Sequence, residues 1–279
     1  MTSSTTADKP RTLLFSLIAL GLTLLATTGR LCSLLFFYDR IGYYKAGAIL
    51  PILSNILFAV SVVFFGVAAI TMLKPEKTIA IPTKPMGYAA LLPAFALATY
   101  AVATLGSVMS PELNIVALLS VLFAIISAVF FVSLTFCRQP SVLSVFTGIG
   151  AIAWLAISWF NSYRDFTVPM NSPDKLFFHF GCIGATLFVF SEIRTVYGMS
   201  RPRFYYFSLF TAILSLAVSS IPSLIGNACG VFASYSLTLE DFFFLALFVY
   251  AVARLLALVS GKPTEAVESN VNTVEETKQ

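Results

Sequence analysis

The chain has 279 residues, of which 58% are hydrophobic and only 11% carry a charged side chain. Soluble proteins usually have about 45–50% apolar and about 25% charged residues. This composition excludes a water-soluble enzyme domain, a disordered chain and a disulfide scaffold, and it predicts a protein made mostly of membrane-spanning segments.

Long apolar segments recur along the whole sequence. A helix needs roughly 20 mostly apolar residues to cross about 30 Å of hydrocarbon. Eight segments meet that requirement, at 12–37, 47–73, 87–107, 114–136, 141–161, 174–197, 204–226 and 237–259. Their apolar runs are continuous rather than alternating, which excludes a membrane β-barrel. We therefore predict an all-α, polytopic transmembrane helix bundle with eight spanning helices; a merger of two segments would leave seven.

The segments outside these runs are short. Residues 1–11 are predicted to form a short N-terminal tail and 12–260 the transmembrane bundle. Residues 261–279 form a polar, mildly acidic tail, and this composition predicts disorder. No segment is long enough for a soluble domain. Any function is therefore expected among the helices, at their ends or in a partner protein.

Lysine and arginine residues are distributed unevenly between the two predicted sides. If the N-terminus is cytoplasmic, the inner side holds 12 of the 17 Lys and Arg residues and the outer side holds 5. An excess of cations on the cytoplasmic side sets membrane topology. The sequence thus predicts a multi-pass protein of the cell membrane with both termini in the cytoplasm. The short loops favour a bacterial cytoplasmic membrane.

Motifs for catalysis, metal binding and cofactor binding are missing from the sequence. The chain has 1 histidine, His179, whereas haem ligation by two histidines and an HExxH zinc helix each need two. No P-loop, dinucleotide fingerprint or Gly-x-Ser-x-Gly elbow occurs. We therefore predict a non-enzymatic protein with no catalytic residues, no cofactor and no metal site.

Two ionisable residues lie at membrane depth near the predicted inner face. Glu192 and Arg254 are each about five residues from the cytoplasmic end of their helix. Charges at this depth are costly and need partners. Arg194 is close to Glu192 in sequence but lies on another helix face. We predict an ion pair between Glu192 and Arg254; in the alternative, Arg254 extends to lipid phosphate and Glu192 reaches the interface alone.

A second group of ionisable residues lies near the predicted outer face. At 1.5 Å per residue, Arg30 is about 27 Å along its helix from Thr12. Glu240 and Asp241 open the last span, and His179 lies about one and a half turns into the sixth. We predict that these residues line the mouth of a cavity for a small solute or a lipid head group. The alternative is an interfacial rim of aromatic and charged side chains, which polytopic membrane proteins commonly have.

Three arginines lie around the turn between the sixth and seventh spans. Arg194, Arg201 and Arg203 stand beside aromatic residues at the predicted inner face. Such a cluster is suited to bind anionic lipid or an acidic cytoplasmic partner. The alternative is ordinary positive-inside topology combined with an aromatic belt.

Cysteines and glycines raise two further questions. Cys32 and Cys229 both fall near the predicted outer face, where a disulfide would form in an oxidising compartment. The alternative is that all four cysteines are unpaired. Gly181 and Gly184 in the sixth span are expected at close helix–helix contacts, because small residues let two helices approach.

The distribution of polar residues guides the prediction of function. Ion-coupled transporters usually bury carboxylates or a broken helix near the bilayer midplane. The midplane of these spans holds Ser, Thr, Asn and Pro but no acid. We therefore predict an accessory or sensor-type membrane protein that binds a ligand or a partner. The alternative is a facilitator for a small neutral or amphipathic solute.

The expected partners follow from the same reasoning. Membrane lipids are expected to surround the bundle, and the candidates for specific binding are a membrane or cytoplasmic protein and a small-molecule ligand. The net charge of +4 is explained by the predicted topology. Nucleic acid is excluded, because no basic stripe is interleaved with exposed aromatic residues.

Overall fold

The computed structural model describes residues 8–39, 42–72, 87–108, 114–136, 142–166, 169, 172–199, 201–231 and 239–260. The helices in chain order are α1 (Asp8–Phe37), α2 (Ile49–Met72), the short 3₁₀ helix η1 (Tyr88–Ala90), α4 (Leu91–Val108), α5 (Ile115–Phe136), α6 (Val142–Arg164), α7 (Pro173–Val196), α8 (Pro202–Ala228) and α9 (Leu239–Ser260). In these ranges no strand occurs, and one isolated β-bridge joins Tyr38 to Tyr44. Most of the predicted N-terminal tail and all of the predicted C-terminal tail lie outside the described residues.

The helices have the dimensions expected of a membrane protein. In the part of the chain that the structure describes, 8 helices are long and apolar enough to cross a membrane. Their bounds agree with the predicted segments to within a few residues; α5, for example, covers Ile115–Phe136 where 114–136 was predicted. The predicted all-α bundle of eight spans is therefore confirmed.

The outward faces of the helices carry large apolar side chains. Leu24, Val63, Phe95 and Val102, from three different helices, are between 66% and 75% exposed. Water-soluble proteins rarely expose large continuous apolar surfaces, and such surfaces commonly mark contact with a membrane or another protein. This surface is compatible with an integral membrane protein whose outer helices face lipid.

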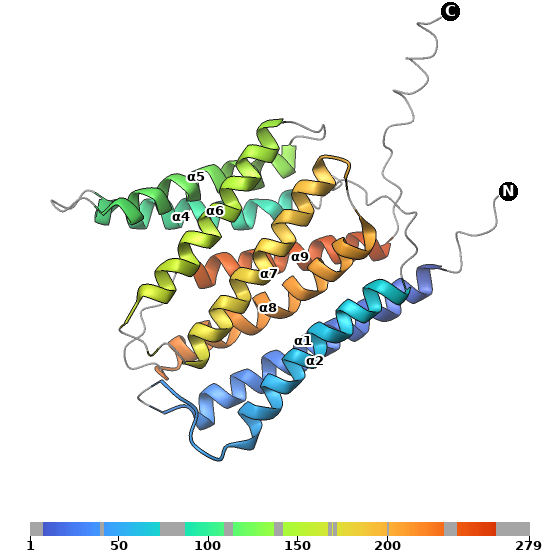
Figure 1. Ribbon diagram of the computed structural model, residues 1–279, viewed down its shortest axis with the longest axis vertical. Coiled ribbons are helices and arrows are strands. Elements are labelled where there is room, and N and C mark those ends of the chain that lie inside the picture. Colours follow the sequence, from blue (N-terminus) through green and yellow to red (C-terminus); the bar gives the residue numbers. More distant parts are fainter. Residues whose placement is uncertain are drawn as a thin grey trace, which may run out of the picture.

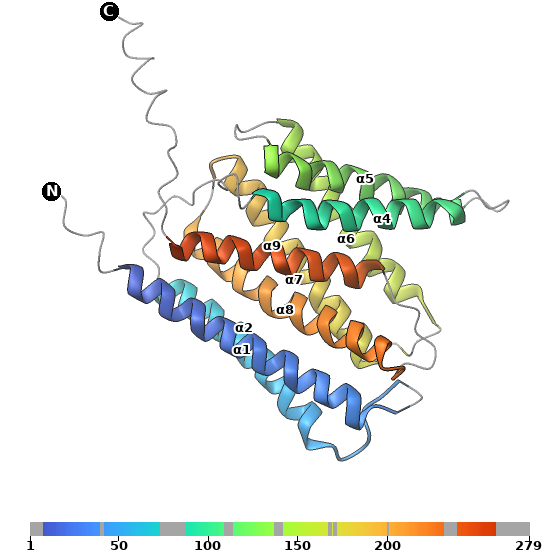
Figure 2. The ribbon, with the colours of Figure 1, turned by 180° about the vertical axis from the view of Figure 1, so that it is seen from behind.

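Helix α8 lies at the centre of the bundle (Figures 1 and 2). Helices α1 and α2 pack on one side of α8, while α7 and α9 pack on the other, with α4, α5 and α6 beyond them. In α8, 78% of the spanning window is buried, compared with 28–56% in the other spans. The central position of α8 allows it to contact residues from both sides of the bundle.

The two ends of the bundle are distinct, and each is named here after its buried arginine. At the Arg30 end, α1, α6 and α8 finish while α7 and α9 begin (Figure 1). At the Arg254 end, α1, α6 and α8 begin while α7 and α9 finish. The first residues of α1 and the last residues of α9 thus lie at the same end.

Glycines bring α7 very close to α8. A Cβ atom added to Gly181 would lie 2.9 Å from the Phe244 ring and 3.0 Å from the Ser219 hydroxyl. A Cβ atom added to Gly184 would overlap the hydroxyl of Ser215. The predicted close contacts at these two glycines are confirmed, and the tight α7–α8 pair holds the ends of both helices in place.

Candidate functional site

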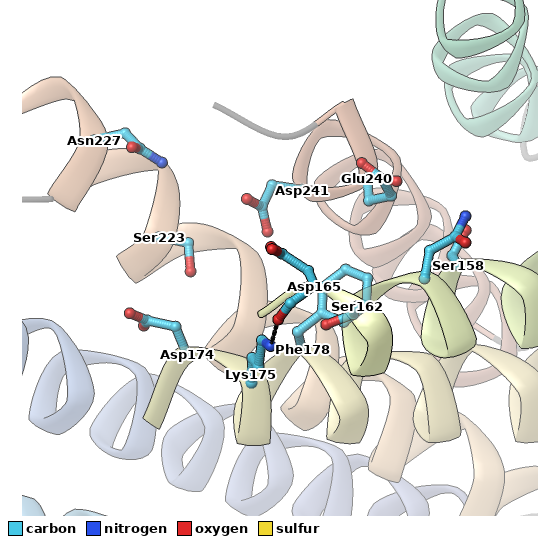
Figure 3. A pocket seen from close by; sticks show the side chains of 11 residues that line it. Ser158, Ser162, Asp165, Asp174, Lys175, Phe178, Ser223, Asn227, Glu240 and Asp241 are labelled. Atoms are coloured by element: carbon cyan, nitrogen blue, oxygen red, sulfur yellow. Dashed lines mark hydrogen bonds between the residues drawn. The ribbon is translucent and has the colours of Figure 1, made fainter. Parts of the chain in front are cut away.

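A cavity of about 270 Å³ lies at the Arg30 end (Figure 3). Its wall is formed where two helices finish and two begin. Ser158, Asn161 and Ser162 come from α6, Asp165 follows α6, Asp174, Lys175 and Phe178 come from α7, Ser223 and Asn227 from α8, and Glu240 and Asp241 from α9. Apart from Phe178, each of these side chains is polar or charged, so the cavity differs sharply from the apolar surface of the bundle.

The start of α7 is fixed by local sequence. Ser172 is the N-cap, and its hydroxyl accepts a hydrogen bond from the backbone N–H of Lys175 at 3.3 Å. Pro173 occupies the first turn, where its missing N–H costs nothing. The Lys175 ammonium is buried and donates a hydrogen bond to the backbone carbonyl of Asp165. The cap and this hydrogen bond thus position α7 against the end of α6.

An ion pair between α1 and α7 adjoins the cavity. Arg30 is 1% exposed, and its Nη2 lies 2.8 Å from Oδ1 of Asp174. The second carboxylate oxygen of Asp174 accepts a hydrogen bond from the Tyr38 hydroxyl at 2.6 Å. The guanidinium also lies over the Phe177 ring, 4.3 Å from its centroid, which is a favourable cation–π position. Asp174 therefore faces the cavity with its charge already compensated.

A proline in α8 prepares a place for the Arg30 guanidinium. Pro222 lies inside α8 and has no N–H, so it cannot donate to the carbonyl of Val218 four residues earlier. Arg30 Nη1 donates a hydrogen bond to that Val218 carbonyl and another, at 3.0 Å, to the carbonyl of Ser219. The backbone acceptor that Pro222 leaves unused is thus satisfied by a buried cation from α1.

The connection between α1 and α2 folds back over this ion pair. Tyr38 and Tyr44 form the isolated bridge, and their rings pack edge to face with centroids 6.0 Å apart. The Tyr44 phenol lies near both Arg30 and Asp174. Burial raises the pKa of Tyr44 above its ordinary value, and the Arg30 charge opposes this shift only in part. Tyr44 is therefore neutral at physiological pH.

One polar atom in the cavity wall, the Ser158 hydroxyl, has no hydrogen-bond partner among the described residues. Ser158 is 2% exposed, and its Oγ makes no hydrogen bond within the described part of the chain. An unsatisfied buried hydroxyl typically costs about 1–3 kcal/mol. Because Ser158 lines the cavity, a bound molecule or water would satisfy it.

The structure separates the four residues predicted at the outer mouth. Glu240 and Asp241 line the cavity, in the first turn of α9. Arg30 does not line it, because its guanidinium is buried against Asp174 and the α8 carbonyls. His179 does not line it either; its ring packs near Trp159, with centroids 5.9 Å apart, and its Nε2 is buried without a recorded partner among the described residues.

Sequence reasoning missed two charged residues of the cavity, Asp174 and Lys175. Both lie in the first turn of α7, where an acid is a common complement to the helix dipole. The proline at 222 was an available signal, because it leaves a buried carbonyl that needs a donor. That signal predicts a buried hydrogen-bond donor near α8, although it identifies neither Arg30 nor Asp174.

At the Arg254 end the structure brings Glu192 and Arg254 together. Arg254 Nε lies 3.0 Å from Oε1 of Glu192, and both side chains are at most 2% exposed. Tyr205 also donates to Oε1, and the Tyr250 hydroxyl donates to Oε2 at 3.0 Å. The Arg254 guanidinium carbon lies 5.5 Å from the Tyr205 ring centroid. Glu192 is therefore enclosed by donors from α8 and α9, and it is not among the residues that line the cavity.

The three arginines predicted as a docking or lipid-binding cluster have different surroundings. Arg194 donates to the backbone carbonyl of Met199 at 3.1 Å and lies between the rings of Phe190 and Phe204, 5.8 Å from each centroid. Arg201 and Arg203 are exposed. Docking to anionic lipid or to an acidic partner stays a prediction.

Cys32, Cys182 and Cys229 are free thiols in the structure. The considered Cys32–Cys229 disulfide is therefore absent from it, whereas Cys137 lies outside the described residues. Among the described side chains, no group of three or more His, Cys, Asp or Glu residues could hold a metal ion.

The fold and the cavity define the class of molecule: a helix bundle with membrane-spanning dimensions and a cavity lined by polar and charged residues at the Arg30 end. Comparison with protein families, with curated proteins and with solved structures finds no match for this chain. Its function must therefore be argued from the cavity itself.

Proposed function

We propose that this chain is an integral membrane protein that binds a small polar solute in the cavity at the Arg30 end. Its role is that of an accessory or sensor-type component, without catalysis. The observation that carries the proposal is the unpartnered Ser158 hydroxyl in a cavity lined by polar and charged residues together with Phe178. Buried polar groups are normally hydrogen-bonded, so an exception in a cavity wall is a reason to expect a bound molecule.

The cavity has the size and position expected of a solute site. About 270 Å³ is far more than the 10–15 Å³ that one water molecule needs. The site lies at helix ends, so a solute would reach it from the water outside the bilayer. Its polar groups come from several helices, and a bound solute would therefore link the ends of α6, α7, α8 and α9.

Close packing between α7 and α8 favours binding over passage through the bundle. Gly181 and Gly184 meet α8 with no room for a Cβ atom, which leaves no path along this interface in the state described. A facilitator would need these helices to separate. Exposed Arg201 and Arg203 at the opposite end supply a surface through which an accessory protein would contact an acidic partner.

The test is a binding screen on the purified full chain in detergent or nanodiscs. Thermal unfolding is measured with a library of small amines, polyols, amino acids and carboxylates, since a ligand that binds only the folded state raises the midpoint. We expect at least one class to stabilise the protein and Asn227→Trp, which fills the cavity, to remove the effect. Ile225→Trp, an exposed α8 position outside the cavity, is the matched control.

Two outcomes would decide against this proposal. If no member of the library shifts the midpoint at millimolar concentration, the cavity is not a solute site. If a stabilising solute also crosses vesicles containing the protein, and Asn227→Trp stops that flux, the facilitator function replaces the accessory one.

A further inference from the structure

The cavity wall carries more negative than positive charge. Among the described lining residues are four carboxylates, Asp165, Asp174, Glu240 and Asp241, and one ammonium, that of Lys175. Asp174 is compensated by Arg30, which lies behind the wall. With Arg30 included, the four carboxylates are opposed by two cationic side chains, those of Lys175 and Arg30. A charge in a low-dielectric setting is costly unless an opposite charge approaches it.

Helix dipoles do not remove this excess. The N-terminal ends of α7 and α9 each contribute about half a positive charge, and the C-terminal ends of α6 and α8 each contribute about half a negative charge. Because two helices begin and two end around the cavity, these contributions cancel to first order. The dipole of α9 favours an acid in its first turn, but the four helix ends together supply no net positive charge to balance the wall.

Glu240 is the carboxylate best placed to bind a ligand. Its carboxylate accepts a hydrogen bond from its own backbone N–H, and the structure records no cation on it from the described residues. Lys175, the cation in the wall, is directed to the backbone carbonyl of Asp165 (Figure 3). Glu240 thus contributes a carboxylate to the wall of a space large enough for a small molecule.

Resting on the solute-binding function proposed above, we propose that the solute is a small organic cation whose protonated amine lies against Glu240. The unpartnered Ser158 hydroxyl supplies a neutral hydrogen-bonding group in the same wall. The ring of Phe178 offers an aromatic face, which attracts organic ammonium groups. A bare metal ion fits less well, because no described group of three or more acidic, His or Cys side chains could coordinate one.

Four probes with the same four-carbon chain test the charge preference directly. They are 4-amino-1-butanol, 1,4-diaminobutane, 1,4-butanediol and succinate. Calorimetry on the full chain in nanodiscs is expected to show that one or both amines bind at least 10-fold more tightly than the diol, and that succinate does not bind. Raising the salt concentration should weaken binding of the amines, because the attraction is electrostatic.

Variants of the wall test the contact with Glu240. Glu240→Gln should weaken amine binding at least 10-fold, while Glu240→Asp, which keeps the charge, should restore part of it. Asp39→Asn, an acid in the connection between α1 and α2 that does not line the cavity, is the matched control and should change the dissociation constant less than threefold. Gel filtration and thermal unfolding without ligand show whether each variant is folded.

The outcomes separate this proposal from the wider function. Diol or succinate binding as tightly as the amines would overturn the cation class and leave solute binding standing. Amine binding that is unchanged in folded Glu240→Gln would overturn the assigned contact. Failure of all four probes would overturn the cation proposal, and the broad library screen then decides separately whether the cavity binds any solute.

Discussion

Helix α7 carries a buried carboxylate near each end, and the two ion pairs have different surroundings. Glu192 at the Arg254 end is enclosed by Arg254, Tyr205 and Tyr250. Asp174 at the Arg30 end is paired with Arg30 but also lines the cavity. Similar ion pairs thus have two structural roles: the closed cluster fixes helix positions, whereas the pair that borders the cavity also shapes the cavity wall.

The closed cluster predicts the largest loss of stability. Removing one partner of a buried ion pair typically costs about 3–5 kcal/mol, because the other charge is left uncompensated. We expect Arg254→Gln to destabilise the bundle by roughly this amount. Glu192→Gln should cost less, since the amide oxygen still accepts from Tyr205 and Arg254 while its NH2 group donates to the Tyr250 hydroxyl.

A double-mutant cycle measures whether these two residues interact. The Glu192→Gln/Arg254→Gln protein should be clearly more stable than the sum of the two single losses predicts. Chemical or thermal unfolding in one detergent supplies the four free energies of unfolding. Purely additive losses would mean that the two charges do not stabilise each other.

The pair at the Arg30 end should tolerate change better. In Asp174→Asn, Arg30 keeps the carbonyls of Val218 and Ser219 and the face of Phe177. We expect a loss of about 1.5–3 kcal/mol, the range for hydrogen bonds to charged groups, together with weaker solute binding. A stability loss as large as that of Arg254→Gln would show that the cavity-side pair is equally structural.

Removal of single hydroxyls gives a smaller, well-matched comparison at the closed end. Tyr205→Phe removes a hydrogen bond to buried Glu192 and should cost about 1.5–3 kcal/mol. Tyr206→Phe, at the neighbouring half-buried position, should change the free energy of unfolding by less than about 0.5 kcal/mol. Equal effects of the two substitutions would contradict the assigned role of the Tyr205 hydroxyl.

The proline in α8 predicts the smallest effect in the native background. A proline inside a helix usually costs about 3 kcal/mol, but Arg30 already satisfies the Val218 carbonyl that Pro222 leaves unused. Pro222→Ala should therefore stabilise the native protein only a little. In an Arg30→Met protein the Val218 carbonyl has lost the arginine, so Pro222→Ala, which restores a backbone N–H for that carbonyl, should stabilise more. The difference between the two backgrounds, measured by unfolding, isolates the contact.

The sequence predicts the eight spans well, because each span is a continuous apolar run of the required length. The pairing of Glu192 with Arg254 also follows from their similar depth in neighbouring spans. The cavity is harder to predict, because its wall combines helix ends from Ser158 to Asp241 that only the tertiary packing brings together. Arg30 illustrates the limit: its depth indicates a buried partner, yet the partner Asp174 looks in sequence like an ordinary first-turn acid.

The most direct test of solute binding in the cavity is protection of a cysteine introduced into its wall. Ser162→Cys, in a chain whose four native cysteines are replaced by serine or alanine, is alkylated with a water-soluble maleimide. With 4-amino-1-butanol or 1,4-diaminobutane near saturation, we expect the alkylation rate of the Ser162→Cys protein to fall at least fivefold. The alkylation rate of Ile225→Cys, which lies outside the cavity, should be unchanged. Equal alkylation rates of the Ser162→Cys protein with and without a saturating amine would contradict binding in this cavity.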